Sequence, residues 1–212
     1  IFNCVAYNAV DLAEENDDEY AKALLLNRDV PGELARIAND LDATLIHFSS
    51  FYVFAGDIDD KKQGGCVNSS CCGGNCHGGG EKGYGEGAFP NPTSRYAESK
   101  AAGEEAVMMN AKKYYLVRLS KLFGKPGVSE AAKRSFFDVM LEAGKNKPEV
   151  QVVDSEKSCF TYAPDLAMAV KDLIEDSDQY GIYHLPNTGA VTWYEAVQEL
   201  YRQAGLTTTI TP

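Results

Sequence analysis

The chain has 212 residues, of which 44% are hydrophobic and 24% are charged, and these fractions are typical of a globular protein with a substantial core. A formal net charge of −11 argues against nucleic acid or an anionic membrane as a partner, because either partner needs a basic protein surface. We find neither a run of about 20 apolar residues that could span a membrane nor a signal segment, which favours the cytoplasm.

The first quarter of the chain alternates between strand and helix signals. The apolar run 1–7 (IFNCVAY) predicts a buried strand, and an acidic helical stretch covers 11–27. Pro31 either starts a new helical turn or kinks this helix, which then continues with apolar residues at helical spacing over 32–41. Residues 43–54, rich in β-branched and aromatic side chains, predict the second strand.

The middle of the chain begins with a segment that has no periodicity. Residues 55–92 are rich in glycine, lysine and cysteine and predict a long loop that is either functional or disordered. A helix then runs to about residue 111, with Asn91 expected as its N-cap and Pro92 in its first turn.

The remaining elements continue the alternation. Strands are predicted at 114–124, 149–153 and 181–185. Helices are predicted at 130–145, 163–176 and 192–205. Alternating strands and helices are typical of an α/β fold with a parallel sheet covered by helices on both faces.

Tyr96 and Lys100 form the most suggestive pair in the sequence. Residues four apart lie on the same helix face, and a nearby cation is expected to lower the pKa of a phenol. A solvated helix face is the alternative for such a pair taken alone. Candidate groups also follow the predicted strands, at Asn3 to Tyr7, at Ser49 and Ser50, and at Arg118 to Lys121.

Ser50, Tyr96 and Lys100 would together suit proton delivery to a carbonyl group. Serine would hold the carbonyl oxygen, tyrosine would transfer the proton, and lysine would lower the phenol pKa while binding a ribose hydroxyl. This trio lacks a strong nucleophile, so it fits hydride transfer from a nicotinamide cofactor.

Six blocks of the sequence carry a resemblance to a known family. They are NCVAYNAVDLAEE, LLLNRDVPGELARIA, HFSSFYVFAG, GYGEGAFPNPTSRYAESKAAGEEAV, LVRLSKLFG and TYAPDLAMAV. In this order and at these separations they resemble the extended short-chain dehydrogenase/reductases, and most closely the dTDP-4-dehydrorhamnose reductase group. The resemblance implies a Rossmann-type, doubly wound parallel sheet with a small C-terminal substrate lobe.

The resemblance also implies roles for particular residues. It makes Ser50, Tyr96 and Lys100 the catalytic groups. The residues expected to contact the cofactor, NADP(H) or NAD(H), are Ala6, Tyr7, Ser49, Tyr96 and Lys100. Asn27 matches a helix asparagine near the active site of extended members, although a buried polar helix residue is an equal alternative.

Three features depart from the family pattern. The family begins with a strand and a glycine-rich turn that binds the cofactor pyrophosphate, and nothing before Ile1 supplies it, so we expect either a fragment or an unusual mode of cofactor binding. Phe51 replaces an aspartate, next to Tyr52, and Lys121 replaces a tryptophan that commonly meets the sugar. Phe51, Tyr52 and Lys121 are therefore predicted to contact the substrate and to set its identity.

The fourth departure is the cysteine-rich part of the loop. It offers five soft ligands, Cys66, Cys71, Cys72, Cys76 and His77. Their spacing matches no zinc pattern, so a disordered insertion with reactive thiols is favoured over a metal site. The other two cysteines, Cys4 and Cys159, lie in apolar runs and are read as small buried hydrophobes with reduced thiols.

These observations predict a partial NAD(P)-binding Rossmann domain over 1–147 and, over 148–212, mostly a substrate lobe with late Rossmann elements. The predicted activity is reduction of the 4-keto group of a nucleotide-linked 6-deoxysugar, as in dTDP-rhamnose biosynthesis. A nucleotide-sugar epimerase or dehydratase of the same superfamily, or a non-catalytic regulatory subunit on the same fold, is the alternative. The resemblance also implies a possible homodimer.

Overall fold

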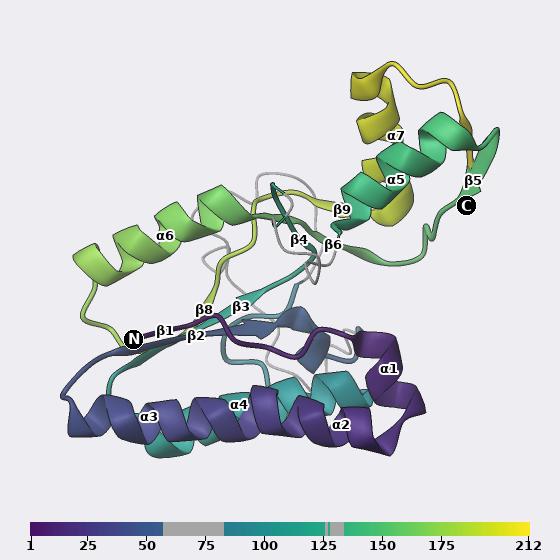
Figure 1. Ribbon diagram of the computed structural model, residues 1–212. Coiled ribbons are helices and arrows are strands. Elements are labelled where there is room, and N and C mark those ends of the chain that lie inside the picture. The colour runs from purple at the N-terminus through teal and green to yellow at the C-terminus, as the bar shows by residue number, and fades with distance from the viewer. Residues whose placement is uncertain (57–82, 126, 128–133) are drawn as a thin grey trace. The chain divides into compact units, whose positions relative to one another are not determined.

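A computed structural model describes residues 1–56, 83–125, 127 and 134–212 (Figure 1). The chain divides into two compact units: unit 1 comprises Ile1–Leu119 and Leu173–Leu185, and unit 2 comprises Ser120–Asp172 and Pro186–Pro212. The first boundary between the units follows Leu119, and the segment Leu173–Leu185 belongs to unit 1 because its strand, near residue 182, pairs with the strand that ends at Leu119. The assignment of cofactor and substrate roles to separate parts of the chain stays a prediction.

Unit 1 contains a parallel sheet of four strands in the order β1-β2-β3-β8. Its strands are β1 (Phe2–Asn3), β2 (Leu45–Ser50), β3 (Tyr114–Leu119) and β8 (Gly181–His184). The register pairs Ser49 with Arg118, and Arg118 with His184, so the carboxyl ends of β2, β3 and β8 lie at one edge of the sheet. The parallel α/β architecture predicted from the sequence is confirmed.

Helices of unit 1 form a layer against one face of this sheet, and Figure 1 shows α2 and α3 following one another end to end with α4 alongside them. The helical segments are α1 (Val10–Glu15), α2 (Asp17–Leu24), a π-helical turn η1 (Leu25–Asp29), α3 (Val30–Asp40), a 3-10 turn η2 (Phe51–Val53) and α4 (Arg95–Asn110). Ala35, Ala38, Leu45 and Val107 pack together between α3, α4 and β2. Pro31 lies in the first turn of α3, as one of the two predicted alternatives has it, but α3 follows η1 without a break, because Asp29 and Val30 both have helical φ and ψ.

Several predicted boundaries in unit 1 are wrong, and one of them is that of the first strand, which covers only Phe2–Asn3 and not residues 1–7. The second strand ends at Ser50 and not at residue 54, because the Ser50 hydroxyl accepts a hydrogen bond from the Tyr52 N–H and the chain turns into η2. The N-cap of α4 is Ser94, whose hydroxyl accepts from the Ala97 N–H at 3.2 Å, and not Asn91. The backbone N–H of Asn91 instead donates to the Val53 carbonyl at 2.8 Å.

Unit 2 is built from short strands and amphipathic helices. Its helices are α5 (Phe136–Asn146), α7 (Trp193–Ala204) and α6 (Ala163–Asp176), which contributes residues to both units. Its strands pair as β4 (Leu122–Phe123) with β7 (Thr161–Tyr162), β5 (Glu149–Gln151) with β10 (Thr209–Thr211), and β6 (Lys157–Cys159) with β9 (Ala190–Thr192). Val150, Val152, Val197 and Tyr201 form its core. Strands β6, β7, β9 and β10 were not predicted.

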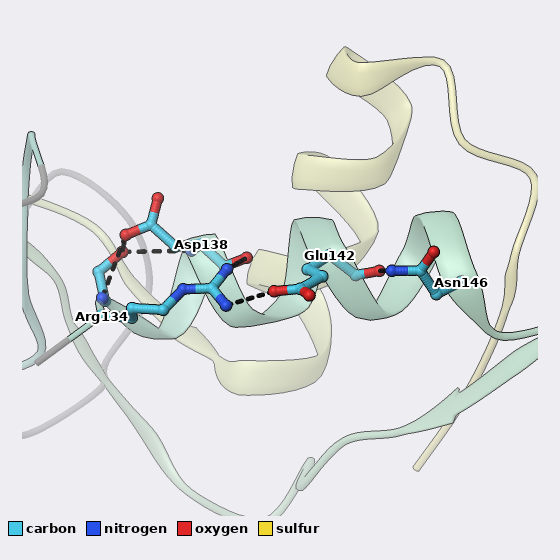
Figure 2. A network of polar contacts seen from close by, with 5 residues as sticks. Arg134, Asp138, Glu142 and Asn146 are labelled. Atoms are coloured by element: carbon cyan, nitrogen blue, oxygen red, sulfur yellow. Dashed lines mark hydrogen bonds and ion pairs between the residues drawn. The ribbon is translucent and has the colours of Figure 1, made fainter.

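The ends of α5 and α7 follow familiar capping rules. Ser135 and Asp138 form a capping box, so α5 begins at Phe136, and residues 130–133 of the predicted helix lie outside the described residues. Figure 2 shows Arg134 lying along the first turns of α5, where it pairs with Glu142 and donates to the Asp138 carbonyl at 3.1 Å. Helix α7 closes on Gly205 at a φ of 66°, as the sequence predicted. In the described ranges, no helix is both long and apolar enough to cross a membrane.

Candidate active site

Tyr96 and Lys100 lie on the buried face of α4. Their exposed fractions are 8% and 3%, which excludes the solvated helix face that a lone pair of this spacing would suggest. The Lys100 ammonium donates a hydrogen bond to the Phe48 carbonyl oxygen at 2.8 Å. Phe48 is two residues before Ser50 on β2, so this bond fixes Lys100 at the carboxyl end of that strand.

Ser50 is connected to Tyr96 through Tyr52. The Ser50 hydroxyl accepts from the Tyr52 N–H at 3.2 Å, and the Tyr52 ring meets the Tyr96 ring edge-on with 5.7 Å between centroids. The three predicted catalytic residues therefore lie in one region of unit 1, around the end of β2 and the first turns of α4.

The electrostatics of this region differ from the expectation. Burial, with a smaller contribution from the neighbouring Tyr52, raises the pKa of Tyr96 to about 12. Burial lowers the pKa of Lys100 to about 8, and the Glu104 carboxylate opposes that change. The lowered Tyr96 pKa that was expected from Lys100 is not found, because burial removes the phenol from water and raises its pKa. Tyr96 is accordingly a neutral phenol, the form that can donate a proton.

A side-chain amide ties the loop after β1 to the helix of Tyr96. The Asn27 side chain accepts from the Tyr7 N–H at 2.9 Å and donates to the Tyr7 carbonyl at 3.3 Å and to the Ser99 hydroxyl at 2.9 Å. The Ser99 hydroxyl donates to the Tyr96 carbonyl at 2.7 Å. Asn27 is thus a fully buried polar residue with defined partners, and it holds Tyr7 beside α4.

A glycine permits this close approach of η1 and α4. A Cβ atom on Gly103 would lie 1.9 Å from the backbone oxygen of Asn27, so no other residue fits there without moving a helix. Asn27 itself lies in the π-helical turn, a feature that is often found at functional sites.

Strand β2, whose Phe48 carbonyl accepts from Lys100, also carries polar groups with unused hydrogen-bonding capacity. The Ser49 hydroxyl is buried and has no hydrogen-bond partner in the part of the chain that the structure describes. Lys100 has three N–H donors, one of which is used by Phe48. His47 is a neutral core residue, since burial and Lys100 hold its pKa near 3, and its Nδ1 lies 3.0 Å from Asn3 Nδ2. Ala6 is half-buried next to Tyr7.

The predicted substrate residues lie in different units. In unit 1, Phe51 packs on His184 with 4.8 Å between centroids, and Tyr52 is 53% exposed. In unit 2, Lys121 adopts a φ of 44° and places its ammonium 4.0 Å from the ring centroid of Trp193 and 5.1 Å from that of Phe160. Burial lowers the pKa of Lys121.

Sequence reasoning missed a buried ion pair next to Lys100. Both oxygens of Glu104 accept from Arg118, at 2.9 and 2.7 Å, and the two side chains are 0% and 1% exposed. A signal was present, because Glu104 follows Lys100 by four residues and Arg118 was noted at the end of a predicted strand.

The cysteine-rich segment lies outside the described residues, so its metal-site prediction is neither confirmed nor overturned. Among the residues described, no group of three or more His, Cys, Asp or Glu side chains could hold a metal ion. Cys159 is half-buried, but Cys4 is exposed and is not the core hydrophobe that was expected.

Comparison with known proteins yields consistent matches. The model of the RmlD substrate binding domain family matches residues 1–212. The chain is 30% identical to a probable dTDP-4,6-dihydroxy-2-methyloxan-3-one 4-ketoreductase from Streptomyces antibioticus, covering 95% of this chain and 58% of that protein. It is 28% identical to the dTDP-4-dehydrorhamnose reductase of Escherichia coli K12, covering 96% of this chain and 59% of that protein.

A solved structure of a relative is also similar. The dTDP-4-dehydrorhamnose reductase of Bacillus anthracis, crystallised in complex with NADP, has a TM-score of 0.81 and 31% sequence identity, and the match covers 100% of this chain and 64% of that one. The chain thus spans about three fifths of the length of the relatives that it matches.

Proposed function

The chain belongs to the RmlD substrate binding domain family, and we propose that it takes part in the NAD(P)H-dependent reduction of the 4-keto group of a nucleotide-linked 6-deoxysugar, as in dTDP-rhamnose biosynthesis. The observation that carries the proposal is the buried face of α4, where Tyr96 and Lys100 lie beside the strand end that bears Ser50. The names of the relatives and the NADP complex of one of them support it.

The residues around Lys100 fit a nicotinamide cofactor. Lys100 retains two N–H donors, and the Ser49 hydroxyl is buried without a partner among the described residues, so both suit the hydroxyls of a ribose. We assign Ala6, Tyr7, Ser49, Tyr96 and Lys100 to cofactor contact. NAD(P)H, when bound, supplies the hydride.

The chain's own residues would handle the proton. The Ser50 hydroxyl would hold the keto oxygen of the substrate by a hydrogen bond. Tyr96, whose pKa of about 12 keeps it protonated at neutral pH, would donate the proton to that oxygen. Phe51, Tyr52 and Lys121 would contact the sugar nucleotide and select it.

The test is NADPH oxidation with a dTDP-4-keto-6-deoxysugar, comparing Tyr96→Phe with the unchanged protein. The variant keeps the ring and its packing but loses the proton donor, so the rate is expected to fall by about 10² to 10⁴. Tyr180→Phe removes an exposed hydroxyl from the same unit and is expected to keep the full rate. Equal rates for Tyr96→Phe and the unchanged protein would refute the assignment.

The same assay separates the alternatives. An epimerase or dehydratase would convert the sugar without net consumption of NADPH, and a regulatory subunit would not convert it. We further propose a homodimer, from the resemblance, and a cytoplasmic location, because the sequence contains no run of about 20 apolar residues that could span a membrane. Light scattering on the purified protein measures the oligomeric state, and a monomer at micromolar concentration would contradict the dimer.

A further inference from the structure

The buried pair of Glu104 and Arg118 is not explained by stability alone. Both side chains are removed from water, and such a pair typically stabilises a fold no better than apolar residues of the same size. The pair lies one helical turn beyond Lys100, next to the proposed cofactor site. Its position therefore suggests a role toward Lys100.

Glu104 is the natural ion-pair partner of Lys100. The two residues are four apart on α4, a spacing at which opposite charges meet, and both lie on the buried face. In a buried site an ammonium and a carboxylate at this spacing attract each other strongly. Yet the Lys100 ammonium donates to the Phe48 carbonyl on β2 instead.

The contacts of Arg118 explain why Lys100 does not pair with Glu104. Its Nε and Nη2 atoms take both oxygens of Glu104 in a bidentate arrangement, the strongest geometry for an arginine–carboxylate pair. The guanidinium is itself fixed, because it lies 5.0 Å from the Phe54 ring centroid and its Nη1 is 3.4 Å from both the Glu86 carbonyl and His184 Nε2.

We propose that Arg118 is a positioning residue for Lys100: by occupying both oxygens of Glu104, it keeps this carboxylate from capturing Lys100, whose ammonium then reaches the carboxyl end of β2. This inference rests on the proposed function, in which Lys100 binds the cofactor. Arg118 itself touches neither cofactor nor substrate in this scheme.

The charges around Lys100 support the assignment. On its own helix Lys100 faces Tyr96, which is neutral, and Glu104, which raises the pKa of Lys100. From β2 it faces His47, which is also neutral. Arg118, on β3, acts on Lys100 through Glu104: it binds both oxygens of the carboxylate that raises the Lys100 pKa.

The test uses the full-length protein and two variants, Arg118→Met and the double variant Glu104→Gln/Arg118→Met. Two quantities are measured: the titration of the Lys100 side chain by ¹³C NMR without nucleotide, and the affinity for NADPH at pH 6.5. Lys100→Arg assigns the Lys100 signal. The exposed bidentate pair Glu199/Arg202 gives the matched control, Glu199→Gln/Arg202→Met.

In Arg118→Met the released carboxylate is expected to pair with Lys100. The Lys100 midpoint should rise by about one pH unit or more, and NADPH affinity should fall about tenfold because the ammonium is withdrawn from β2. In the double variant no carboxylate remains, so the Lys100 midpoint should fall below that of the unchanged protein. NADPH affinity should then return to within about threefold of the original value. A merely structural role would not shift the two midpoints in opposite directions.

The proposal is overturned if Arg118→Met leaves both quantities unchanged, or if the double variant loses as much affinity as the single one. If Arg118→Met does not fold, the double variant alone tests the proposal. A lowered Lys100 midpoint with near-original NADPH affinity then supports it, and a tenfold loss of NADPH affinity overturns it. A protein that never binds NADPH would refute the proposed function, and the titrations would still test Arg118.

Discussion

Lys100 in unit 1 and Lys121 in unit 2 are both lysines withdrawn from water, and burial lowers the pKa of each. Lys100 donates to a carbonyl oxygen at 2.8 Å, whereas the Lys121 ammonium lies over the rings of Trp193 and Phe160. A carbonyl oxygen fixes the direction of one N–H bond, but a ring face attracts a cation with little directional preference. The comparison teaches that the orientation of the Lys100 ammonium is fixed by a hydrogen bond, whereas only the position of the Lys121 ammonium is fixed, by the two rings.

The largest expected difference between the two lysines is kinetic. Lys100→Met should lower kcat about a thousandfold, because the proposed catalytic trio loses the charge that orients the cofactor beside Tyr96. Lys121→Met should instead raise KM for the sugar nucleotide several-fold, since we assign Lys121 to substrate contact. Steady-state kinetics of NADPH oxidation on both variants tests this split. If both substitutions changed the same kinetic parameter by the same factor, the proposed difference in role between Lys100 and Lys121 would be refuted.

A smaller effect is expected from one methyl group added to a helix in each region. Gly103→Ala on α4 would place Cβ 1.9 Å from a backbone oxygen, so it should lower the free energy of unfolding by about 3 kcal/mol. Gly144→Ala on α5 would meet the Tyr201 and Leu206 side chains at 2.6 to 2.9 Å. Because side chains adjust and alanine favours helix, its loss should be about 1 kcal/mol.

Urea denaturation of both variants measures this difference. Equal losses would mean that the close approach of α4 to η1 is no more rigid than the packing of α5 on α7. A loss for Gly144→Ala larger than that for Gly103→Ala would reverse the comparison.

The smallest effect is a pH dependence that should belong to Lys100. Its pKa of about 8 means that the ammonium is present below pH 8 and is lost as pH rises above it. NADPH affinity should therefore be constant from pH 6 to about 7.5 and fall by up to about tenfold per unit above pH 8. Fluorescence titration across this range measures it, and Lys100→Arg, which stays charged, should give a flat profile. A flat profile in the unchanged protein would contradict the assignment.

The sequence predicted those parts of the fold whose signals are local. The amphipathic pattern predicted α6 with its observed bounds, and Gly205 correctly predicted where α7 ends. The three-residue strands β5 and β10 gave a weak signal or none, because their pairing joins segments about 60 residues apart. The N-cap of α4 was misplaced because Asn91, Thr93 and Ser94 all qualify by residue type, and only the backbone geometry selects Ser94.

The sequence indicated which residues could gather around Lys100, but it did not indicate their electrostatics. The spacing of Tyr96 and Lys100 predicted that they share one helix face, and both lie on the buried face of α4. Their pKa values depend on burial, which arises when β2 packs against α4, and the acceptor of Lys100 lies 52 residues away in the sequence. The same reason hid the pair of Glu104 and Arg118, because the two side chains meet only when β3 packs against α4.

The strand order of unit 1 has a consequence for how the chain folds during synthesis. Strand β8 forms the edge of the sheet beside β3, but it leaves the ribosome after all residues of unit 2 up to Asp172. At ordinary rates of translation this delay lasts several seconds, during which one edge of β3 has no strand to pair with. A nascent chain halted before Gly181 should therefore expose this edge to chaperones, and protection should appear once His184 has emerged.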